Sequence, residues 1–439
     1  MNTSPATRRD FVKTSAVAGG ALATAVHFPH VANAAAAGDK IKIGWVGCGG
    51  RGTGAANQAL NADSNLVMWS MGDVFQDKID SGLASLKEVQ SKNPEKVNVS
   101  KERQFTGIDA FQKVLNSGVD VVLLTTSPGF RPQHIRAAIE AGKHVFAEKP
   151  MAVDGPGVRS VMESIKLAKQ KNLALVDGFV WRWTTANRDA FAKIHDGAVG
   201  DIRAIYTSYY SGAVDRYPKW NRTNTKTDLE WQIRRWYYFT WLSGDHIVEQ
   251  AVHSVDKLLW AMKDEPPESV ICTGGRQVRP GGDGGEYGNI YDHFAAEYKW
   301  AGGVKGYHFC RQFDRCHGAV TEQVFGTKGV YEGESGGKRH VITGENRWRW
   351  TGDKTQNGYQ TEHDEMYASI RAGKPLNTGD RFIKTTLTAI MARMAAYTGK
   401  EITWEMALNS KEDLFPKNMT WDMKLPVAPV AKPGQTQFS

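Results

Sequence analysis

The sequence predicts an α/β protein whose first half is a parallel β-sheet with helices on both faces. From residue 41 onward, short runs of β-branched residues alternate with helical patterns, which is typical of such a sheet. The first run leads directly into a glycine-rich turn, and the second run ends at an acidic residue. The runs that we expect to form strands are residues 41–47, 66–72, 119–126, 144–147 and 173–176.

Length and composition exclude several other classes of protein. The chain has 439 residues, of which 41% are hydrophobic and 23% charged, so it can form two domains with apolar cores. Its net charge is +8, but basic and acidic residues are interspersed, which argues against nucleic-acid binding. No apolar run of about 18 residues follows the N-terminal segment, so we expect no membrane span. The cysteines are too few and too scattered for a disulfide framework or a paired zinc motif, although the last two remain open to pairing; they are Cys48, Cys272, Cys310 and Cys316.

The first 34 residues predict a twin-arginine export signal. The pair Arg8-Arg9 precedes a weakly apolar run at residues 14–28, and a small-residue cleavage site follows at residues 32–34. A disordered basic tail is the alternative, but it does not explain this order. We therefore exclude residues 1–34 from the fold and expect the protein to pass through the twin-arginine translocase to the periplasm or another exported location. Cargo of this route typically carries a cofactor inserted in the cytoplasm, so we expect a tightly held cofactor.

The glycine-rich turn has the residues and the position of a pyrophosphate-binding loop. Gly47 permits the tight turn after the strand, and Gly49 lets backbone amides approach a pyrophosphate. Gly52 lets the following helix pack closely on the strand. Glycine turns between strands and helices are common, so the pattern gains its weight from the strand before it and the acid after it. We expect the cofactor to contact Gly47, Gly49, Gly50, Arg51 and Gly52.

Asp73 follows the second expected strand, 21 residues after Gly52. At this position a carboxylate can accept hydrogen bonds from the hydroxyls of the adenosine ribose; capping of the next helix is the alternative role. Residues 74–76 include no Arg or Lys for a 2′-phosphate, so the sequence favours NAD over NADP. Strand, loop and acid in this order predict a Rossmann dinucleotide-binding domain.

The segment Gly-Lys-His-Val at residues 142–145 leads into the fourth expected strand, and Glu148-Lys149-Pro150 follows that strand directly. With the glycine loop and Asp73, this pattern resembles the glucose–fructose oxidoreductase, inositol dehydrogenase and MocA family, over about residues 41 to 410. The family implies an N-terminal Rossmann domain and a C-terminal α+β domain with a largely antiparallel open sheet that carries the substrate. We therefore expect a Rossmann domain at residues 35–180, a substrate domain at residues 181–410 and a tail at residues 411–439.

Lys149 stands at the carboxyl end of a parallel strand, which is where ligands of open α/β sheets bind. An ammonium there can hydrogen-bond a substrate hydroxyl and stabilise the developing alkoxide; without the resemblance, a surface charge would be the default interpretation. The resemblance implies that Lys149 is catalytic, that Glu148 lies near the nicotinamide ribose and that Pro150 is cis. We also expect Ser127 and His134, which follow the third strand, to contact the cofactor.

Residues 243–260 predict one amphipathic helix that carries an acid and a base. Apolar residues recur at helical spacing on one face, and a second stripe holds Asp245, Glu249, His253 and Asp256. The family has D-x-x-x-H on this helix, with the histidine as proton acceptor. Here Glu249 replaces the aspartate, so the acid's role stays open between holding the substrate and orienting the ring. A core histidine is the alternative for His253, and a metal site with His246 is disfavoured because no H-E-x-x-H motif occurs.

Aromatic residues and arginines gather before this helix. Six of the fourteen tryptophans lie between residues 181 and 241, and many of the aromatic residues there are expected to belong to the core. Aromatic faces combined with guanidinium donors suit the C–H faces and hydroxyl edges of a sugar ring. We therefore expect a carbohydrate or polyol to contact Trp181, Arg182, Arg234, Trp236 and Tyr237.

The resulting hypothesis is an exported NAD-dependent oxidoreductase that transfers hydride between a ring carbon of a sugar, glycoside or cyclic polyol and a tightly held nicotinamide. The alternative is a glycoside hydrolase or lyase, similar to glycoside hydrolase family 109, that oxidises C3 transiently, eliminates the glycosidic bond and takes the hydride back. A third hypothesis is a sugar-binding protein that keeps NAD only for its structure. The resemblance also implies a homo-oligomer.

Overall fold

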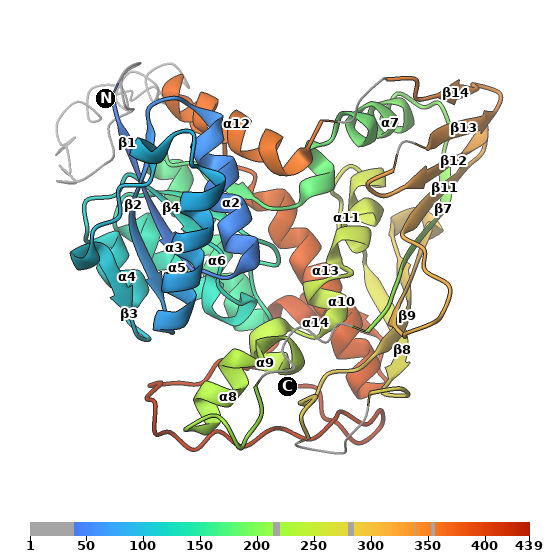
Figure 1. The fold of residues 1–439 in the computed structure, drawn as a ribbon. Coiled ribbons are helices and arrows are strands. Elements are labelled where there is room, and N and C mark those ends of the chain that lie inside the picture. The colour runs from blue at the N-terminus through green and yellow to red at the C-terminus, as the bar shows by residue number, and fades with distance from the viewer. Residues whose placement is uncertain (1–38, 214–219, 280–284, 338, 353–355) are drawn as a thin grey trace, which may run out of the picture. The chain divides into compact units, whose positions relative to one another are not determined.

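Two β-sheets organise the chain in the computed structural model, which describes residues 39–213, 220–279, 285–337, 339–352 and 356–439 (Figure 1). The predicted export signal lies outside the described residues. The first sheet is parallel, and the second is largely antiparallel. Both the predicted Rossmann sheet and the second sheet implied by the family resemblance are therefore confirmed.

The parallel sheet has the order β3-β2-β1-β4-β5-β6 within the described part of the chain. Strands β4 and β5 are buried along their whole length, so helices must cover both faces. The order reverses between β1 and β4, and ligands of open α/β sheets bind at such a point. The strands are β1 (Ile41–Val46), β2 (Leu66–Asp73), β3 (Gln104–Thr106), β4 (Val121–Leu124), β5 (His144–Ala147) and β6 (Leu175–Asp177), and the helices beside them are α2 (Gly50–Ala62), α3 (Gln76–Val89), α4 (Ala110–Leu115), α5 (Arg131–Glu140) and α6 (Gly155–Gln170).

The five strands predicted from the sequence are present, with ends that shift by up to two residues. Strand β3 was not predicted. It is three residues long, carries mainly polar side chains and, within the described part of the chain, pairs with β2 alone at the sheet edge. Such a segment has too few apolar residues to show an alternating pattern.

The second sheet has the order β14-β13-β12-β11-β7-β10-β9-β8-β15 among the described residues. All of its neighbouring pairs are antiparallel except β7 with β10, which run parallel. The alternating burial along β10 leaves one face of that strand more exposed than the other. The strands are β7 (Ile202–Ser211), β8 (Ser269–Gly275), β9 (His293–Lys299), β10 (Lys305–Gln312), β11 (Thr321–Gly326), β12 (Gly329–Glu334), β13 (His340–Gly344), β14 (Trp348–Arg349) and β15 (Ile402–Thr403).

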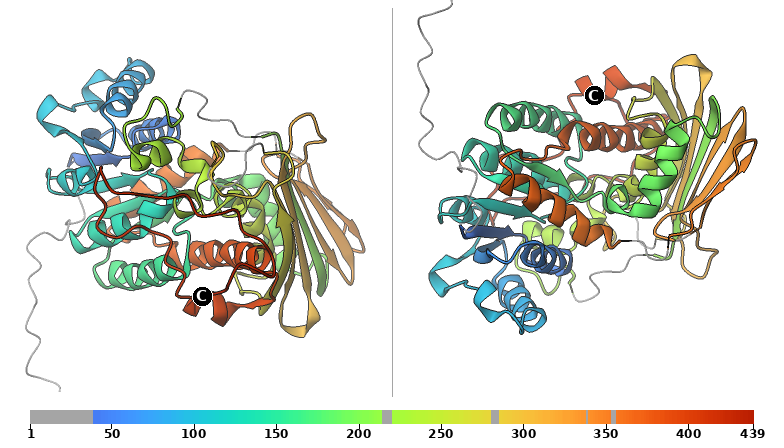
Figure 2. Two further views of the ribbon diagram at one scale, coloured as in Figure 1. Left: turned by 90° about the horizontal axis from the view of Figure 1, so that it is seen from below. Right: turned by 90° about the horizontal axis from the view of Figure 1, so that it is seen from above.

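Helices from the end of the sequence connect the two sheets. Helix α13 (Gly379–Thr398) is buried over most of its circumference and packs against both β8 and α6 (Figure 2). Helix α12 (Gly358–Arg371) packs along α2. The other helices here are α7 (Thr185–His195), α8 (Asp228–Arg234), α9 (Thr240–Ser243), α10 (His246–Glu249), α11 (Val252–Ala261) and α14 (Trp404–Asn409), and the short 3₁₀ helices of the chain are η1 (Pro94–Lys96), η2 (Lys101–Arg103), η3 (Pro128–Phe130), η4 (Val180–Trp183), η5 (Trp236–Tyr238) and η6 (Ala301–Gly303).

Residues 411–439 form an irregular tail without helix or strand, as predicted. The ring of Phe415 packs edge-on against Phe130 and Trp241, with centroids 5.2 and 5.8 Å away. Farther along, the Trp421 ring lies 5.9 Å from Phe75. The tail therefore supports aromatic side chains that follow β2 and β4 and one that belongs to α9.

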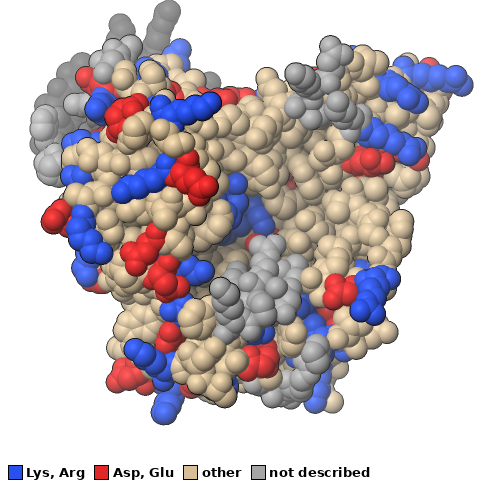
Figure 3. Space-filling view, viewed as in Figure 1, with Lys and Arg blue, Asp and Glu red and all other residues tan. Residues whose placement is uncertain are grey.

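The described residues show how charge is distributed on one face, how apolar the helices are and whether the cysteines are bonded. On the face shown in Figure 3, basic and acidic side chains are interspersed. Within the described ranges, no helix combines the length and apolarity needed to cross a bilayer. All four cysteines are described and free; Cys310 is buried and Cys316 exposed, so the pairing left open by the sequence does not form.

The single helix predicted at residues 243–260 is wrong, because the structure has two helices there. Asp245, with φ of 76°, caps α10, and α11 begins at Val252. The Ala251 N–H bonds to the His246 carbonyl five residues earlier, which interrupts the regular i to i−4 series. The apolar pattern continues through the break, so the sequence gives no sign of it. The break frees the Glu249 carbonyl, which instead accepts a hydrogen bond from Lys149.

Arg182 belongs to a buried ion-pair network, which corrects its prediction as a substrate ligand. Its Nε and Nη2 donate to the two carboxylate oxygens of Asp256, at 2.7 and 2.9 Å. Nη2 also reaches Asp264 at 2.6 Å, and the guanidinium lies over the Trp260 ring. Two carboxylates thus hold the guanidinium inside the protein, where it ties η4 to α11.

Replacing Arg182 is expected to affect stability strongly, because Arg182→Met leaves the buried Asp256 carboxylate without its cation. We expect the free energy of unfolding to fall by about 3–5 kcal/mol, measured by urea denaturation. The matched control is Arg188→Met, since the pair of Arg188 with Glu365 is substantially exposed and should contribute less than about 1 kcal/mol. Equal losses for both variants would contradict the assignment.

Candidate functional site

The glycine loop connects β1 to α2 and leaves the start of that helix open. Gly47 has φ of +92°, a conformation that favours glycine. A Cβ on Gly52 would lie 2.3 Å from the Gly47 carbonyl oxygen, so only glycine fits there. Around Gly49 and Gly50 a Cβ would meet nothing within 4 Å, and no side chain caps the helix. The first amides of α2 therefore face an open space suited to an anion.

Asp73 holds this loop from the end of β2. Its Oδ2 accepts a hydrogen bond from the Cys48 N–H at 2.7 Å, and its Oδ1 accepts one from the Phe75 N–H at 3.0 Å. Burial raises the pKa of Asp73 to about 6, although both hydrogen bonds act in the opposite direction. The carboxylate lines a cavity of about 180 Å³ next to the glycine loop.

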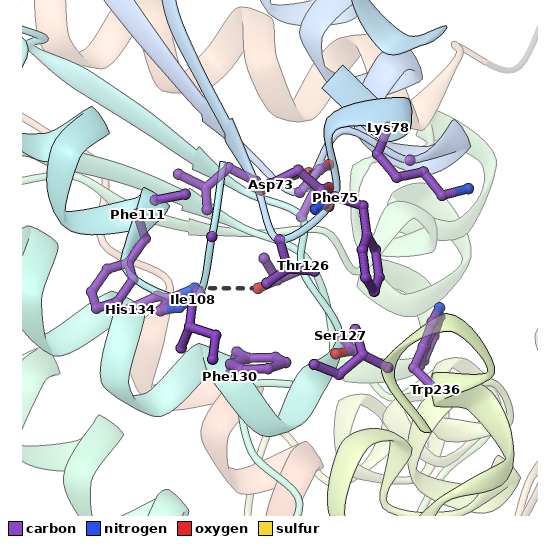
Figure 4. Close-up of a pocket in the computed structure, with 18 of the residues that line it drawn as sticks. Asp73, Phe75, Lys78, Ile108, Phe111, Thr126, Ser127, Phe130, His134 and Trp236 are labelled. Carbon is purple, nitrogen blue, oxygen red and sulfur yellow. Dashed lines mark hydrogen bonds between the residues drawn. The ribbon is translucent and has the colours of Figure 1, made fainter. Parts of the chain in front are cut away.

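This first cavity lies between the two halves of the chain. Figure 4 shows Asp73 and Phe75 on one side of it and Phe130 and Trp236 on the other. His134 also lines it, with its Nδ1 3.4 Å from the Thr126 hydroxyl. Burial lowers the pKa of His134 to about 3, so its ring is neutral. The predicted cofactor residues that line this cavity are Gly47, Gly49, Gly50, Asp73, Ser127 and His134.

Two basic residues of the first cavity were missed as cofactor neighbours. Lys78, on the first turn of α3, lines it, and so does Arg234 from α8. Arg234 was predicted to bind substrate, but its guanidinium lies over the Phe75 ring and pairs with Asp77 at 3.0 Å. The lack of Arg or Lys at residues 74–76 therefore does not leave this cavity without cations.

A second cavity of about 470 Å³ adjoins the first and shares Gly49, Ser127 and Trp236 with it. It collects residues from the carboxyl ends of the parallel strands and from α10 and α11. The predicted site residues that line it are Gly49, Gly50, Arg51, Gly52, Ser127, Glu148, Lys149, Trp236, Glu249 and His253. The fold thus brings the cofactor and catalytic predictions into one continuous space.

Lys149 and Glu249 form the central contact of the second cavity. The Lys149 ammonium donates to the Glu249 backbone carbonyl and lies 3.2 Å from its Oε1. Burial lowers the pKa of Lys149, although Glu249 and Glu148 raise it. The Lys149–Pro150 peptide is cis, as the resemblance implies.

His253 is a neutral imidazole in this environment. Burial, together with the nearby charge of Lys149, lowers its pKa well below the ordinary value. Its Nδ1 is buried and has no hydrogen-bond partner among the described residues. The ring packs against Trp181, with centroids 5.0 Å apart. A neutral imidazole can accept a proton at its unprotonated ring nitrogen.

An acidic and basic cluster lies beside the glycine loop. Arg51 is hydrogen-bonded to Glu148, and its Nη2 lies 3.6 Å from Glu362 of α12. Glu362 is fully buried, neither of its oxygens makes a hydrogen bond within the described part, and burial raises its pKa well above the ordinary value. Tyr359 places its ring 4.4 Å from the Arg51 guanidinium. Glu362 and Tyr359 were not predicted from the sequence, because they lie more than 200 residues from Arg51 and Glu148 along the chain.

The predicted substrate residues divide into several groups. Trp236 lines both cavities. Trp181 packs on His253 without lining either cavity, and Tyr237 is fully buried behind Gln250, 3.4 Å from its Oε1. Tyr237 is therefore corrected from a substrate ligand to a support for Gln250. Further residues of the second cavity that were not predicted from the sequence include Arg131, Tyr209 and Gln250; the position of Arg131 after a strand end is a signal that could have found it.

No group of three or more His, Cys, Asp or Glu side chains among the described residues is arranged to hold a metal ion. The two adjoining cavities instead form one long groove with polar and apolar walls. The open start of α2 and the buried carboxyl of Asp73 are part of this groove. A dinucleotide fits this arrangement, because its pyrophosphate needs free amides and its ribose needs a carboxylate.

Curated relatives match the chain over part of its length. Inositol 2-dehydrogenase of Gluconacetobacter diazotrophicus is 27% identical over 169 residues, which are 38% of this chain and 48% of the relative. An uncharacterized oxidoreductase of Streptococcus pneumoniae is 23% identical over 271 residues, covering 60% of this chain and 67% of the relative. The chain thus spans about half the length of the first of these relatives.

Solved structures share the fold over most of the chain. An apo scyllo-inositol dehydrogenase from Lactobacillus casei superposes with a TM-score of 0.61 at 19% identity, covering 84% of this chain and 99% of that chain. An aldose–aldose oxidoreductase from Caulobacter crescentus, complexed with glycerol, reaches a TM-score of 0.64 at 18% identity, covering 83% and 99%. At these identities the likeness shows the fold alone.

Family comparison covers both halves of the chain. Residues 41–179 match the oxidoreductase family with an NAD-binding Rossmann fold, and residues 188–332 match the GFO/IDH/MocA C-terminal domain. The glycine loop, Asp73 and the Lys149 segment lie in the first match, and Glu249 and His253 lie in the second. The chain belongs to the GFO/IDH/MocA oxidoreductase family.

Proposed function

We propose that this chain is an oxidoreductase that transfers hydride between a ring carbon of a sugar, glycoside or cyclic polyol and NAD. The observation that carries the proposal is the second cavity, in which Lys149, Glu249 and His253 adjoin the open glycine loop. The relatives named inositol 2-dehydrogenase and the structural neighbour named aldose–aldose oxidoreductase support the substrate class.

The cofactor fits the residues of the loop and the first cavity. The amides at the start of α2 would hold the pyrophosphate, and Asp73 would accept hydrogen bonds from the adenosine ribose. A bound nicotinamide supplies the acceptor for the hydride. We favour NAD over NADP because the Asp73 carboxylate repels a 2′-phosphate. The cations Lys78 and Arg234, which line the same cavity, would attract that phosphate.

His253 and Lys149 have complementary tasks in alcohol oxidation. Loss of hydride from the carbon requires loss of the hydroxyl proton, which passes to a ring nitrogen of the neutral His253. The Lys149 ammonium donates a hydrogen bond to the same oxygen and stabilises the charge that develops on it. Glu249 holds Lys149 in place through its carboxylate and its backbone carbonyl.

Export and tight cofactor retention also belong to the proposal. The sequence of residues 1–34 supports passage through the twin-arginine translocase. Free NAD is scarce outside the cytoplasm, so an exported enzyme of this kind needs to retain its cofactor and to regenerate it on the protein. The position of Trp236 on both cavities supports retention. We also propose a homo-oligomer, on the family resemblance alone.

The affinity for NAD is expected to fall as pH falls through about 6, where Asp73 takes up a proton. The ionised carboxylate accepts the ribose hydroxyls and the protonated form does not, so binding at pH 5 should be about tenfold weaker than at pH 8. Calorimetric titration with NAD at both values measures this. Asp73→Asn should bind weakly at both, and the same pH dependence in this variant would contradict the role of Asp73.

His253→Ala is expected to reduce turnover by about 10²–10⁴-fold, because the proton acceptor is lost. NAD binding should stay within about twofold of wild type, since the glycine loop is unchanged. The matched control is His317→Ala, which removes an exposed histidine outside both cavities and should leave turnover unchanged. Steady-state rates with the best substrate, together with the NAD titration, test this. Normal turnover in His253→Ala would remove the proposed proton path.

A further inference from the structure

Arg131, the first residue of α5, is a buried cation without an ion-pair partner. Its side chain is only 4% exposed, and no carboxylate of the described residues lies within ion-pair distance of it. Burial lowers the pKa of Arg131 to about 10, while Glu148 and Glu249 raise it, so the guanidinium stays charged at neutral pH. Burying a cation without a direct counter-ion is costly, which points to a task at this position.

The guanidinium ties together two strand exits. Its Nη1 donates to the Pro150 carbonyl at 2.5 Å, and its Nη2 donates to the Thr126 carbonyl at 2.6 Å. Thr126 follows β4, and Pro150 follows β5 directly after Lys149. The two hydrogen bonds therefore fix the backbone from which the Lys149 side chain extends.

The same guanidinium is one of several charges around Lys149. Glu249 of α10 is 3.2 Å from the ammonium, and Glu148 precedes it on the chain. These carboxylates stabilise the charged amine, whereas Arg131 of α5 opposes its charge. His253 of α11 is neutral and adds no charge. Arg51 of α2 lines the same cavity as a cation bonded to Glu148, whereas Arg131 opposes the charge of Lys149 and has no ion-pair partner among the described residues.

We propose that Arg131 is a positioning residue for Lys149, which fixes the backbone next to the amine and keeps a permanent positive charge beside it. The inference rests on the proposed function, in which Lys149 interacts with the substrate oxygen. Without this charge, Glu148 and Glu249 would hold the Lys149 proton more tightly.

The direct test measures the protonation of Lys149 in the folded protein without any substrate. Acetic anhydride labels only the unprotonated amine, and peptide mass spectrometry reads the labelled fraction of Lys149 as a function of pH. In Arg131→Met the labelling midpoint should rise by about one pH unit, because the opposing charge is gone. Arg131→Gln removes the charge but keeps a donor, and it carries the same expectation if the methionine variant does not fold.

Two further variants separate charge from structure. Arg131→Lys keeps a cation but cannot reach both carbonyls as a planar fork, so the midpoint should remain near that of wild type while kcat falls about tenfold. Arg136→Met removes an exposed arginine of the same helix and should change neither quantity. Circular dichroism and NAD titration verify that each variant is folded.

An unchanged midpoint in a folded Arg131→Met or Arg131→Gln protein would overturn the inference, as would a rise of about one unit in Arg131→Lys. The labelling experiment is independent of turnover. A raised midpoint in the neutral variants, in a protein that oxidises no sugar or polyol, would support the role of Arg131 and contradict the proposed function.

Discussion

The contact between Lys149 and Glu249 joins the two halves of the chain at the point where the cavities adjoin. The parallel sheet brings Lys149 to the carboxyl end of β5, and the break between α10 and α11 frees the Glu249 carbonyl for its ammonium. Without the break, that carbonyl would be bonded within a continuous helix. The position of His253, four residues later on α11, follows from the same geometry. The helix break is therefore a structural requirement of the site.

Charge compensation around this contact follows one scheme. Two cations of the second cavity each have a carboxylate partner, Arg51 with Glu148 and Lys149 with Glu249. Buried cations and carboxylates that are paired avoid most of the cost of leaving water. Arg131 departs from the scheme, because its hydrogen bonds go to carbonyls. One uncompensated cation among paired charges makes the environment of Lys149 different from that of an ordinary surface lysine.

The elements that sequence analysis predicted correctly are those encoded by neighbouring residues. The glycine loop, Asp73 and the strand before Lys149 each occupy a short segment, and the order of strands and helices fixes how they meet. Arg182 and Tyr237 were misplaced, because their partners Asp256 and Gln250 become neighbours only in the folded chain. Glu362 reaches the glycine loop through the packing of α12 on α2, which no local sequence pattern predicts. The helix break likewise coincides with a tertiary contact, the hydrogen bond from Lys149 to the Glu249 carbonyl, which the local sequence does not show.

The most direct test of the account mixes the NAD-loaded protein with single sugars, glycosides and polyols in the absence of any other acceptor. The absorbance of reduced nicotinamide and the amount of product are then measured per active site. The account predicts at least one compound that gives about one oxidised product and one reduced nicotinamide per site, and then stops. Many cleaved glycosides per site without net reduction would contradict it and favour the transient-oxidation hydrolase or lyase. Binding of sugars with neither reduction nor product would contradict catalysis altogether.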